Sequence, residues 1–374
     1  MHLFRKKQQS KNNKMHNFAS HSHKALLLST LLLSPLTYAN NSDKPLTEEQ
    51  QQFQNQVNEC VTILENTGVV ETNDKLVKRY CESKIMAKNA GKLGRYAKRV
   101  LAERATELNP FVITPHEPSY IMPITYTNNF NHDAYKIFDE EGNTSPRDGF
   151  SGLMEAHEAK YQVSFKVPLR SSRLFVQGDA LYFAMTIQAW WQLYSDEISK
   201  PFRETNYKPE IFYIAPLPWE TENGSFGYFI SFEHQSNGQV QGLSRSWNRI
   251  HLGLIYDTDD YSIGIKPWYR IPEDEKNHPL EPTGDDNPDI DDYLGHYEIM
   301  GAYAFNDEHK LSGTFRQNWR TGNGSIELNY TFPLPFSTRL IGFAQFFSGY
   351  GESLIDYNHR QEKIGIGIAL TDVF

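Results

Sequence analysis

The sequence predicts an all-β fold: a twelve-stranded antiparallel transmembrane β-barrel that follows an N-terminal α-helical extension. Three observations support this fold class. From about residue 111 onward, segments of about ten residues alternate between apolar and polar positions, as strands with one lipid-facing side do. Clusters of Gly, Asn, Asp or Pro separate these segments. Their number is even, which is the rule for bacterial single-chain barrels.

Residues 1–39 have the composition of a secretory signal peptide. They contain six basic residues and no acidic residue, and a Leu-rich run at 25–36 precedes the small residues that a signal peptidase reads. A buried helix at the start of a domain is the alternative. The run is shorter than the roughly 20 apolar residues that cross a bilayer as a helix, so a polytopic helical membrane protein is excluded. The rest of the chain carries 31 basic and 46 acidic residues, a net charge of −15, which argues against nucleic acid as a partner.

Residues 40–112 form a predicted helical extension in the periplasm. The segments 46–66 and 74–108 are rich in Glu, Gln, Lys, Ala and Leu and contain no proline, and their apolar spacing predicts one helix in each. Cys60 and Cys81 are the two cysteines of the chain. Export to an oxidising compartment favours a disulfide between them. We expect this bond to join the two helices as a hairpin.

Residues 113–374 hold the predicted barrel. Its expected strands cover residues 119–128, 158–169, 174–193, 205–217, 228–236, 246–257, 261–271, 293–305, 310–319, 325–332, 338–348 and 361–374. In the last strand Ile364, Ile366, Ile368 and Leu370 share one face, which the terminal Phe374 continues. This strand resembles the signal that the outer-membrane assembly machinery recognises, so we expect that machinery as a partner during biogenesis. A soluble β-sandwich with a half-buried last strand is the alternative.

The strand 228–236 carries polar residues on its apolar face. Side chains alternate between the two faces of a strand, and the even positions run from Tyr228 through Ile230 and Phe232 to His234 and Ser236. The apolar face of a barrel strand contacts lipid. We therefore expect the histidine and the serine on the lipid side, at the end of an apolar stripe.

Asn248 lies on the same face of the next strand. A hairpin centred near Gln241 places His234 opposite Asn248, because both are equidistant from residue 241, and opposed residues have Cβ atoms roughly 5 Å apart. A serine hydroxyl needs a neighbouring base, an imidazole can take and return the proton, and an asparagine can orient the ring. We expect Ser236 to be the nucleophile, His234 the general base and acid, and Asn248 the residue that orients the imidazole.

The direction of the strands places this group in the outer leaflet. An even number of strands leaves both chain termini on one side of the membrane, which for an exported extension is the periplasmic side. The strand 228–236 then runs outward, and the loop 237–245 is extracellular. We expect the three side chains at the depth of the phospholipid ester groups of the bacterial outer membrane. An uncharged asparagine suits this surface, because a carboxylate facing lipid is costly.

At these residues the chain resembles the outer membrane phospholipase A family of Gram-negative bacteria. The motifs that carry the resemblance are WWQL (190–193), PFRETNY (201–207), HQSNG (234–238), SRSWNR (244–249), KPWY (266–269), DDNPDI (285–290) and SGYGESLIDYN (348–358). The match is good over residues 190–374, looser over the first strands, and absent over 40–110. The resemblance implies hydrolysis of acyl esters of phospholipids and lysophospholipids, at sn-1 and sn-2. It also implies a homodimer as the active form and one Ca²⁺ in each active site.

The resemblance implies further site residues. The backbone N–H of Gly238 matches the group that holds the oxyanion together with calcium. Ser244 and the carbonyl of Gln239 match calcium ligands, and Ser199 matches a carbonyl that the partner subunit contributes. Gln241 stands where the family commonly has an aspartate. Because calcium prefers several oxygen ligands, we expect calcium to be required, at a higher concentration.

Other interpretations compete with this one. Residues 273–292 hold nine acidic residues and one lysine, but the EF-hand spacing is absent, and we interpret the segment as a solvated loop at the barrel rim. A soluble esterase is disfavoured because no G-x-S-x-G motif occurs. The alternative function is a non-catalytic outer-membrane pore or adhesin, because the expected inward residues could line a narrow channel as well as plug it. These residues are Glu233, Arg249, His251, Lys266 and Glu298.

Overall fold

The structure is a computed structural model that describes residues 48–66, 77–78, 80–82, 84–85, 93–106, 112–135, 152–170, 174–176, 178–240, 242–278, 281 and 283–372. The predicted signal peptide at 1–39, Gln241 and Phe374 lie outside these residues. None of the described helices has the length and apolar character that crossing a membrane requires.

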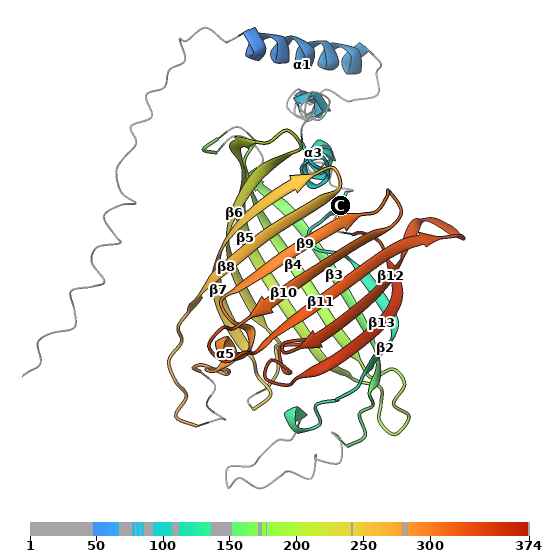
Figure 1. Cartoon of the computed structure of the whole chain (residues 1–374), viewed down its shortest axis with the longest axis vertical. Helices are drawn as coiled ribbons and strands as arrows, with labels where there is room; N and C mark the ends of the chain where they lie inside the picture. The colour runs from blue at the N-terminus through green and yellow to red at the C-terminus, as the bar shows by residue number, and fades with distance from the viewer. Residues whose placement is uncertain are drawn as a thin grey trace, which may run out of the picture. The chain divides into compact units, whose positions relative to one another are not determined.

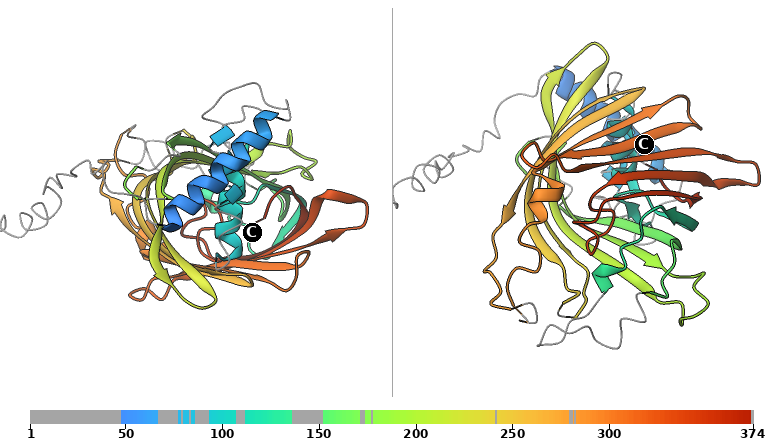
Figure 2. Two further views of the ribbon diagram at one scale, coloured as in Figure 1. Left: turned by 90° about the horizontal axis from the view of Figure 1, so that it is seen from above. Right: turned by 60° about the horizontal axis from the view of Figure 1, so that its bottom comes forward.

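Twelve long antiparallel strands form a closed barrel within the described residues, as the sequence predicts (Figures 1 and 2). Each strand pairs with the next one along the chain, and the pairing of β13 with β2 closes the ring. A short strand, β1 (Thr114–Pro115), pairs with β3. The long strands are β2 (Tyr120–Thr127), β3 (His157–Arg170), β4 (Ala180–Trp191), β5 (Phe202–Glu220), β6 (Gly224–Ser236), β7 (Ser246–Thr258), β8 (Tyr261–Ile271), β9 (Tyr297–Ala304), β10 (Lys310–Gln317), β11 (Gly324–Leu334), β12 (Ser337–Gly349) and β13 (Gln361–Ala369).

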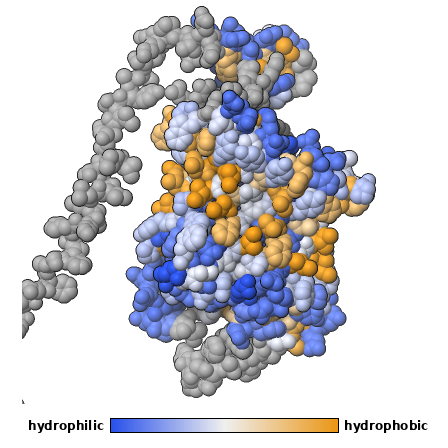
Figure 3. Space-filling model, in the orientation of Figure 1, coloured by the Kyte–Doolittle hydropathy of each residue, from blue (hydrophilic) through white to orange (hydrophobic). Residues whose placement is uncertain are grey.

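Apolar side chains cover the outside of the barrel. In β6, Ile230 is 47% exposed and Phe232 is 46% exposed, whereas the alternate residues Ser231 and Glu233 are buried. The apolar residues form a band across the visible face, with polar surface beyond it (Figure 3). Such a band is what a lipid-facing barrel requires. The predicted outward direction of the even-numbered face of β6 is therefore confirmed.

Paired charges fill much of the barrel interior. Glu233 forms an ion pair with Arg249, and Lys266 Nζ lies 2.5 Å from Glu298 Oε1. The His251 ring, fully buried, lies with Nδ1 3.0 Å from the hydroxyl of a β6 serine. Buried charges are tolerated when they are paired in this way. All five predicted inward residues thus belong to a polar plug, beside a remaining cavity of about 360 Å³.

The loop 350–360 closes the end of the barrel that carries the loop after β6. Glu352 of this loop accepts hydrogen bonds from Lys160 Nζ at 3.0 Å and Trp190 Nε1 at 2.9 Å through Oε1, and from Lys363 Nζ at 3.2 Å through Oε2. Burial opposes ionisation of this carboxyl, but the surrounding cations hold the pKa of Glu352 below its ordinary value. The loop is therefore fixed to three strands of the barrel wall.

Helix α3 (Arg95–Thr106) is attached to the opposite end of the barrel. The Asp257 carboxylate of β7 accepts hydrogen bonds from the backbone N–H groups of Tyr96 and Ala97, at 3.2 and 2.8 Å. A carboxylate at this position satisfies free N–H groups and complements the helix dipole. The Tyr96 side chain lines the interior cavity, where burial raises the pKa of Tyr96 to about 12.

Further contacts hold α3, and two of them reach β3 and the segment after β13. Glu103 Oε2 lies 2.7 Å from Lys166 Nζ of β3, and Arg99 donates a hydrogen bond to the backbone carbonyl of Asp372, which follows β13. The helix therefore binds elements from the beginning, the middle and the end of the barrel sequence.

The prediction of one continuous helix over 74–108 is wrong. Residues 93 and 94 are not helical, and α3 begins after them. A Cβ at Gly94 would lie 2.4 Å from the carboxylate of Asp257. The glycine therefore lets the capping carboxylate approach the helix start, and the chain restarts its helix there.

Two predicted strands begin later than expected, and the first is β4. The sequence predicts a strand from residue 174, but β4 starts at Ala180. The Asp179 carboxylate instead accepts the backbone N–H groups of Leu174, Phe175 and Val176, at 2.6 to 2.9 Å. Despite burial, these bonds lower the pKa of Asp179. The segment before β4 is therefore a turn, in which backbone N–H groups bind the Asp179 carboxylate.

The second late strand is β9, which begins at Tyr297 although the sequence predicts a strand from residue 293. A short helix, α5 (Ile290–Leu294), precedes it. Ile290 and Leu294 are buried against Trp247 and Trp268. Leu294, which the prediction placed in the strand, therefore belongs to a local core beneath the loop.

The N-terminal extension contains helix α1 (Glu48–Asn66) and helical residues at 77–78, 80–82 and 84–85. Cys60 and Cys81 form a disulfide, as the sequence predicts, with Cα atoms 5.7 Å apart. Val57, Cys81 and Ile85 are buried together. The disulfide thus joins two helical segments across a small apolar core.

Candidate active site

The hairpin of β6 and β7 places His234 beside Asn248. The two residues are directly paired in the sheet, as the sequence predicts, and His234 Nδ1 lies 2.9 Å from Asn248 Oδ1. An amide oxygen can only accept a hydrogen bond, so the ring donates its Nδ1–H to it. Nε2 then carries the lone pair, which is the tautomer that a general base needs.

Ser236 is the last residue of β6, two positions beyond His234 and on the same face. It pairs with Tyr207 of β5 on one side and with Ser246 of β7 on the other. Tyr207 is 38% exposed on the outer surface of the barrel, so the serine lies beside lipid-facing residues. Among the described residues, no hydrogen bond joins Ser236 Oγ to His234. Catalytic hydrogen bonds of this kind often tighten only when substrate binds.

Asn237 organises the loop that follows Ser236. Its side chain is buried, and its Oδ1 accepts the backbone N–H groups of Arg245 at 2.9 Å and Gln239 at 3.3 Å. Its Nδ2 donates to the carbonyl of Leu243 at 2.8 Å. One buried amide thus ties both ends of the loop together and fixes the backbone next to the proposed nucleophile.

Gly238 follows in a left-handed conformation, with φ at +62°. This region favours glycine because it has no Cβ, and a Cβ here would meet only the Tyr207 ring at 3.6 Å. In the part of the chain that the structure describes, no acceptor binds the Gly238 N–H. The group is therefore available to a developing negative charge near Ser236.

The loop after β6 and the neighbouring acidic loop offer oxygen atoms suited to a cation. Ser244 Oγ donates to Asp286 Oδ2 at 2.7 Å, and the same carboxylate forms an ion pair with Lys276. Gln239 lies in the same loop, and Ser199 is exposed in the turn between β4 and β5. A hydroxyl, a carboxylate and backbone carbonyls fit the preference of calcium for oxygen ligands.

The acidic loop 273–292 is bound to the candidate site, so its interpretation as a solvated rim loop is incomplete. Asn248 Nδ2 donates to Glu273 Oε1 at 3.0 Å, and the backbone N–H of Ser246 donates to Asn287 Oδ1 at 3.0 Å. Glu273, Asn287 and Asp286 are not among the site residues predicted from the sequence. Their signal was the concentration of acids directly after β8, the strand next to Asn248.

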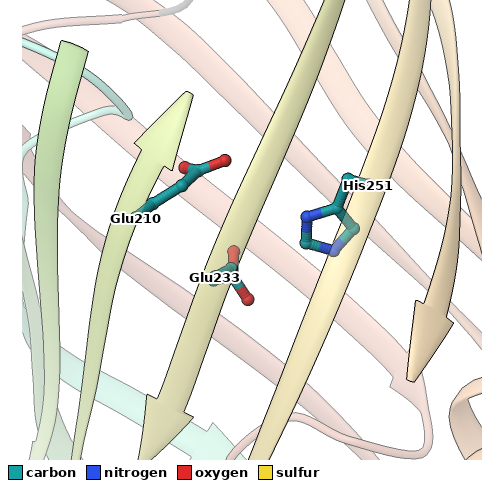
Figure 4. A group of neighbouring side chains, drawn as sticks. All are labelled: Glu210, Glu233 and His251. Carbon is teal, nitrogen blue, oxygen red and sulfur yellow. The ribbon is translucent and has the colours of Figure 1, made fainter. Parts of the chain in front are cut away.

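Glu210, Glu233 and His251 come together inside the barrel, one on each of three adjacent strands (Figure 4). One donor atom from each lies within 4.8 Å of the others. Each side chain already has a protein partner: Glu210 binds His116 Nε2 at 2.9 Å, Glu233 pairs with Arg249, and His251 bonds to a serine. A cation here would compete with the Arg249 guanidinium for the same carboxylate. We assign the group to the polar plug.

A closed transmembrane barrel with a serine, a histidine and an asparagine together on its outer face defines a class of protein, the membrane-embedded β-barrel hydrolases. A family model described as Phospholipase A1 matches residues 96–370. Phospholipase A1 of Escherichia coli (strain K12) is 34% identical over 271 residues, which cover 71% of this chain and 84% of that protein. The chain belongs to the phospholipase A1 family, and its barrel is that of an outer-membrane phospholipase.

Among the solved structures similar to this chain are two outer membrane phospholipases. One is outer membrane phospholipase A from Escherichia coli, described as an active-site mutant in which an asparagine is replaced by alanine. The other is the outer membrane phospholipase of Salmonella typhi, described as a dimer with bound calcium. Each has a TM-score of 0.61 and 32% sequence identity, and each match covers 71% of this chain and 95% of the other. The family match begins at residue 96 and so includes α3, which the sequence analysis assigned to the extension.

Proposed function

We propose that this phospholipase cleaves acyl esters of phospholipids and lysophospholipids at both sn-1 and sn-2, with Ser236, His234 and Asn248 as its catalytic residues. The observation that carries the proposal is the 2.9 Å contact between His234 Nδ1 and Asn248 Oδ1 on the lipid-facing surface, two residues from a serine. The asparagine in the active site of the Escherichia coli relative supports the role of Asn248.

The geometry supports a two-step acyl transfer. Ser236 Oγ attacks the ester carbonyl carbon while His234 Nε2 takes the hydroxyl proton, and the same nitrogen returns that proton to the departing alcohol. His234 then takes a proton from water, whose oxygen attacks the acyl-serine, and returns that proton to Ser236 Oγ as the fatty acid leaves. Asn248 keeps Nδ1–H as a donor throughout. The Gly238 N–H stabilises the negative charge on the carbonyl oxygen.

We propose calcium and a homodimer for this chain, by analogy with the Salmonella typhi relative. Ser244 Oγ, the Asp286 carboxylate and the Gln239 carbonyl would hold the ion, together with the Ser199 carbonyl of a second copy. Gln241 brings no charge, which leaves Asp286 to supply the carboxylate. Bound calcium would place positive charge near the developing oxyanion. Because Lys276 already pairs with Asp286, a raised calcium requirement is expected.

We also propose how the chain is exported and assembled. Residues 1–39 are a cleaved signal peptide, 40–112 a periplasmic extension and 113–374 the barrel, and the outer-membrane assembly machinery recognises the final strand. The outward face of β13 supports this recognition, since Ile364 is 57% exposed and Ile366 is 54% exposed. The described extension contains a disulfide, which agrees with export to an oxidising compartment.

The test is fatty-acid release from mixed phospholipid micelles, with calcium and with a chelator, for the wild type and Ser236→Ala. The acyl chains at sn-1 and sn-2 carry different labels, so each cleavage is counted separately. We expect Ser236→Ala to lose activity by about 10³-fold or more, while Ser225→Ala, at the far end of β6, keeps it. A sulfonyl fluoride should modify Ser236. Wild-type rates in Ser236→Ala would disprove the mechanism, and release of the sn-1 label alone would disprove the sn-2 activity.

A further inference from the structure

The amide of Asn248 is bound on both of its sides. Its oxygen accepts from His234, and its Nδ2 donates to Glu273 Oε1 at 3.0 Å. The register explains this contact: Asn248 pairs directly with Ile271, the last residue of β8, and Glu273 comes two residues later on the same face. Diagonal neighbours of this kind lie within reach of a long side chain.

The backbone that carries Glu273 is fixed. Pro272, the preceding residue, has a restricted φ and no N–H. The next residue, Asp274, accepts the backbone N–H of Asp285 at 2.8 Å through its carbonyl. The carboxylate of Asp285 in turn binds Arg270 Nη2 through both oxygens at 2.7 Å. Glu273 is therefore held between β8 and an anchored loop.

A carboxylate at this position determines which way the amide of Asn248 points. If the amide turned over, its NH₂ group would face His234, and the ring nitrogen Nδ1 would have to accept. The ring proton would then sit on Nε2, and that tautomer cannot take a proton from Ser236. Because a carboxylate only accepts hydrogen bonds, Glu273 holds the NH₂ group on its own side. Its negative charge also favours the imidazolium that forms during the reaction.

We propose that Glu273 is a positioning residue of the active site, which fixes the orientation of Asn248 and thereby the reactive tautomer of His234. The proposal rests on the proposed catalytic role of these two residues. It extends the site to a third strand: carboxylate, amide, imidazole and hydroxyl follow one another from the end of β8 to the end of β6. In this arrangement Asn248 separates the carboxylate of Glu273 from the imidazole of His234.

The first test compares Glu273→Ala, Glu273→Gln and the wild type in the micelle assay at saturating calcium. Glu273→Ala should lower kcat about tenfold with KM unchanged, which corresponds to about 1.4 kcal/mol. Glu273→Gln can still accept from Nδ2 and should keep most of kcat. Glu275→Gln, two residues along the same loop, is the matched control for lost charge and should behave as the wild type. A Glu273→Ala enzyme with unchanged kcat would overturn the proposal.

The second test separates positioning from a general loss of stability. A Glu273→Ala protein that is merely destabilised would show the wild-type kcat once its activity is divided by the folded fraction, which heat-dependent migration in detergent gels measures. A misoriented Asn248 instead lowers kcat of the folded enzyme, and Glu273→Gln should restore it. A tenfold loss that disappears after division by the folded fraction would contradict the positioning role.

The third test separates positioning from calcium binding and from failure of the mechanism itself. If Glu273 acts through Asn248, then Glu273→Ala added to Asn248→Ala causes no further loss. A full additional tenfold loss would show that it acts elsewhere. The calcium Kd, measured by calorimetry, should not change in Glu273→Ala, and a tenfold weaker Kd would make Glu273 a calcium residue instead. Unaltered activity in Asn248→Ala would refute the proposed function rather than the Glu273 contact alone.

Discussion

Lys160 of β3 and Glu352 of the loop 350–360 form an ion pair at 3.0 Å, with side chains 1% and 0% exposed. The pair joins the barrel wall to a loop that also contacts Trp190 and Lys363. An ion pair buried this deeply is costly to break, because the remaining charge is left without a partner. The position of the loop therefore depends on the ion pair between Glu352 and Lys160.

Replacing Glu352 with Gln should destabilise the barrel at neutral pH by about 3 kcal/mol, because Lys160 and Lys363 lose their shared anion. The folded-state pKa of Glu352 is lowered from the ordinary 4.5. Its contribution is therefore fully present above pH 4.5 and is lost as the pH falls through the lower, folded value. Urea unfolding in detergent from pH 3 to 8 measures this. A difference between wild type and variant that stays constant down to pH 3 would contradict the assignment.

Replacing Asp257 with Ala should free the first turn of α3. The loss of two hydrogen bonds from a helix N-terminus costs about 1–2 kcal/mol, and we expect faster proteolysis within α3 and a lower midpoint of unfolding. Asp259→Ala is the control, because Asp259 pairs with Lys98 while remaining 72% exposed, and such surface pairs contribute little. Equal effects of the two variants would argue against the capping role. Catalysis should be retained, since the candidate site lies at the other end of the barrel.

Replacing Gly238 with Ala should lower kcat about tenfold. The substitution strains a residue with φ at +62° and thereby moves the N–H proposed to hold the oxyanion, and such donors are worth about 10²-fold or more when removed entirely. Gly322→Ala is a matched control, because Gly322 has φ at +78° and open space around it, in the loop that follows β10, three strands along the sheet from β7. If Gly322→Ala costs the same activity, backbone strain alone explains the effect.

Replacing Asp286 and Lys276 should change calcium binding in opposite directions. Asp286→Asn removes the proposed carboxylate ligand and should weaken the calcium Kd by about tenfold or more. Lys276→Gln removes the ammonium that competes for it and should tighten the Kd. Asp274→Asn, on the same loop, controls for general charge. Calcium titration by calorimetry measures the Kd of each variant. An unchanged Kd in Asp286→Asn would show that Asp286 is not a calcium ligand.

The barrel and the pairing of His234 with Asn248 could be predicted from the sequence, because strand side chains alternate with a period of two and a hairpin fixes its own register. The contact of Glu273 with Asn248 could have been predicted in the same way. The strands β7 and β8 are separated by only two residues, so their tight turn already pairs Asn248 with Ile271.

Other features could not be derived in this way. The segment between β8 and β9 is long and has no repeating pattern, so neither α5 nor the contact of Asp286 with Ser244 follows from periodicity. The break before α3 depends on Asp257, which lies more than 150 residues away in the sequence. Contacts that join distant segments through single side chains leave no local signature.

Helix α3 precedes every barrel strand in the chain, yet its partners are spread along the whole barrel sequence. Glu103 pairs with Lys166 on β3, the first turn is bound by β7, and Arg99 reaches the carbonyl of Asp372 beyond β13. The last of these contacts cannot form until the final strand is in place. A fully seated α3 therefore requires a completed barrel, although this helix is synthesised before any of the long barrel strands.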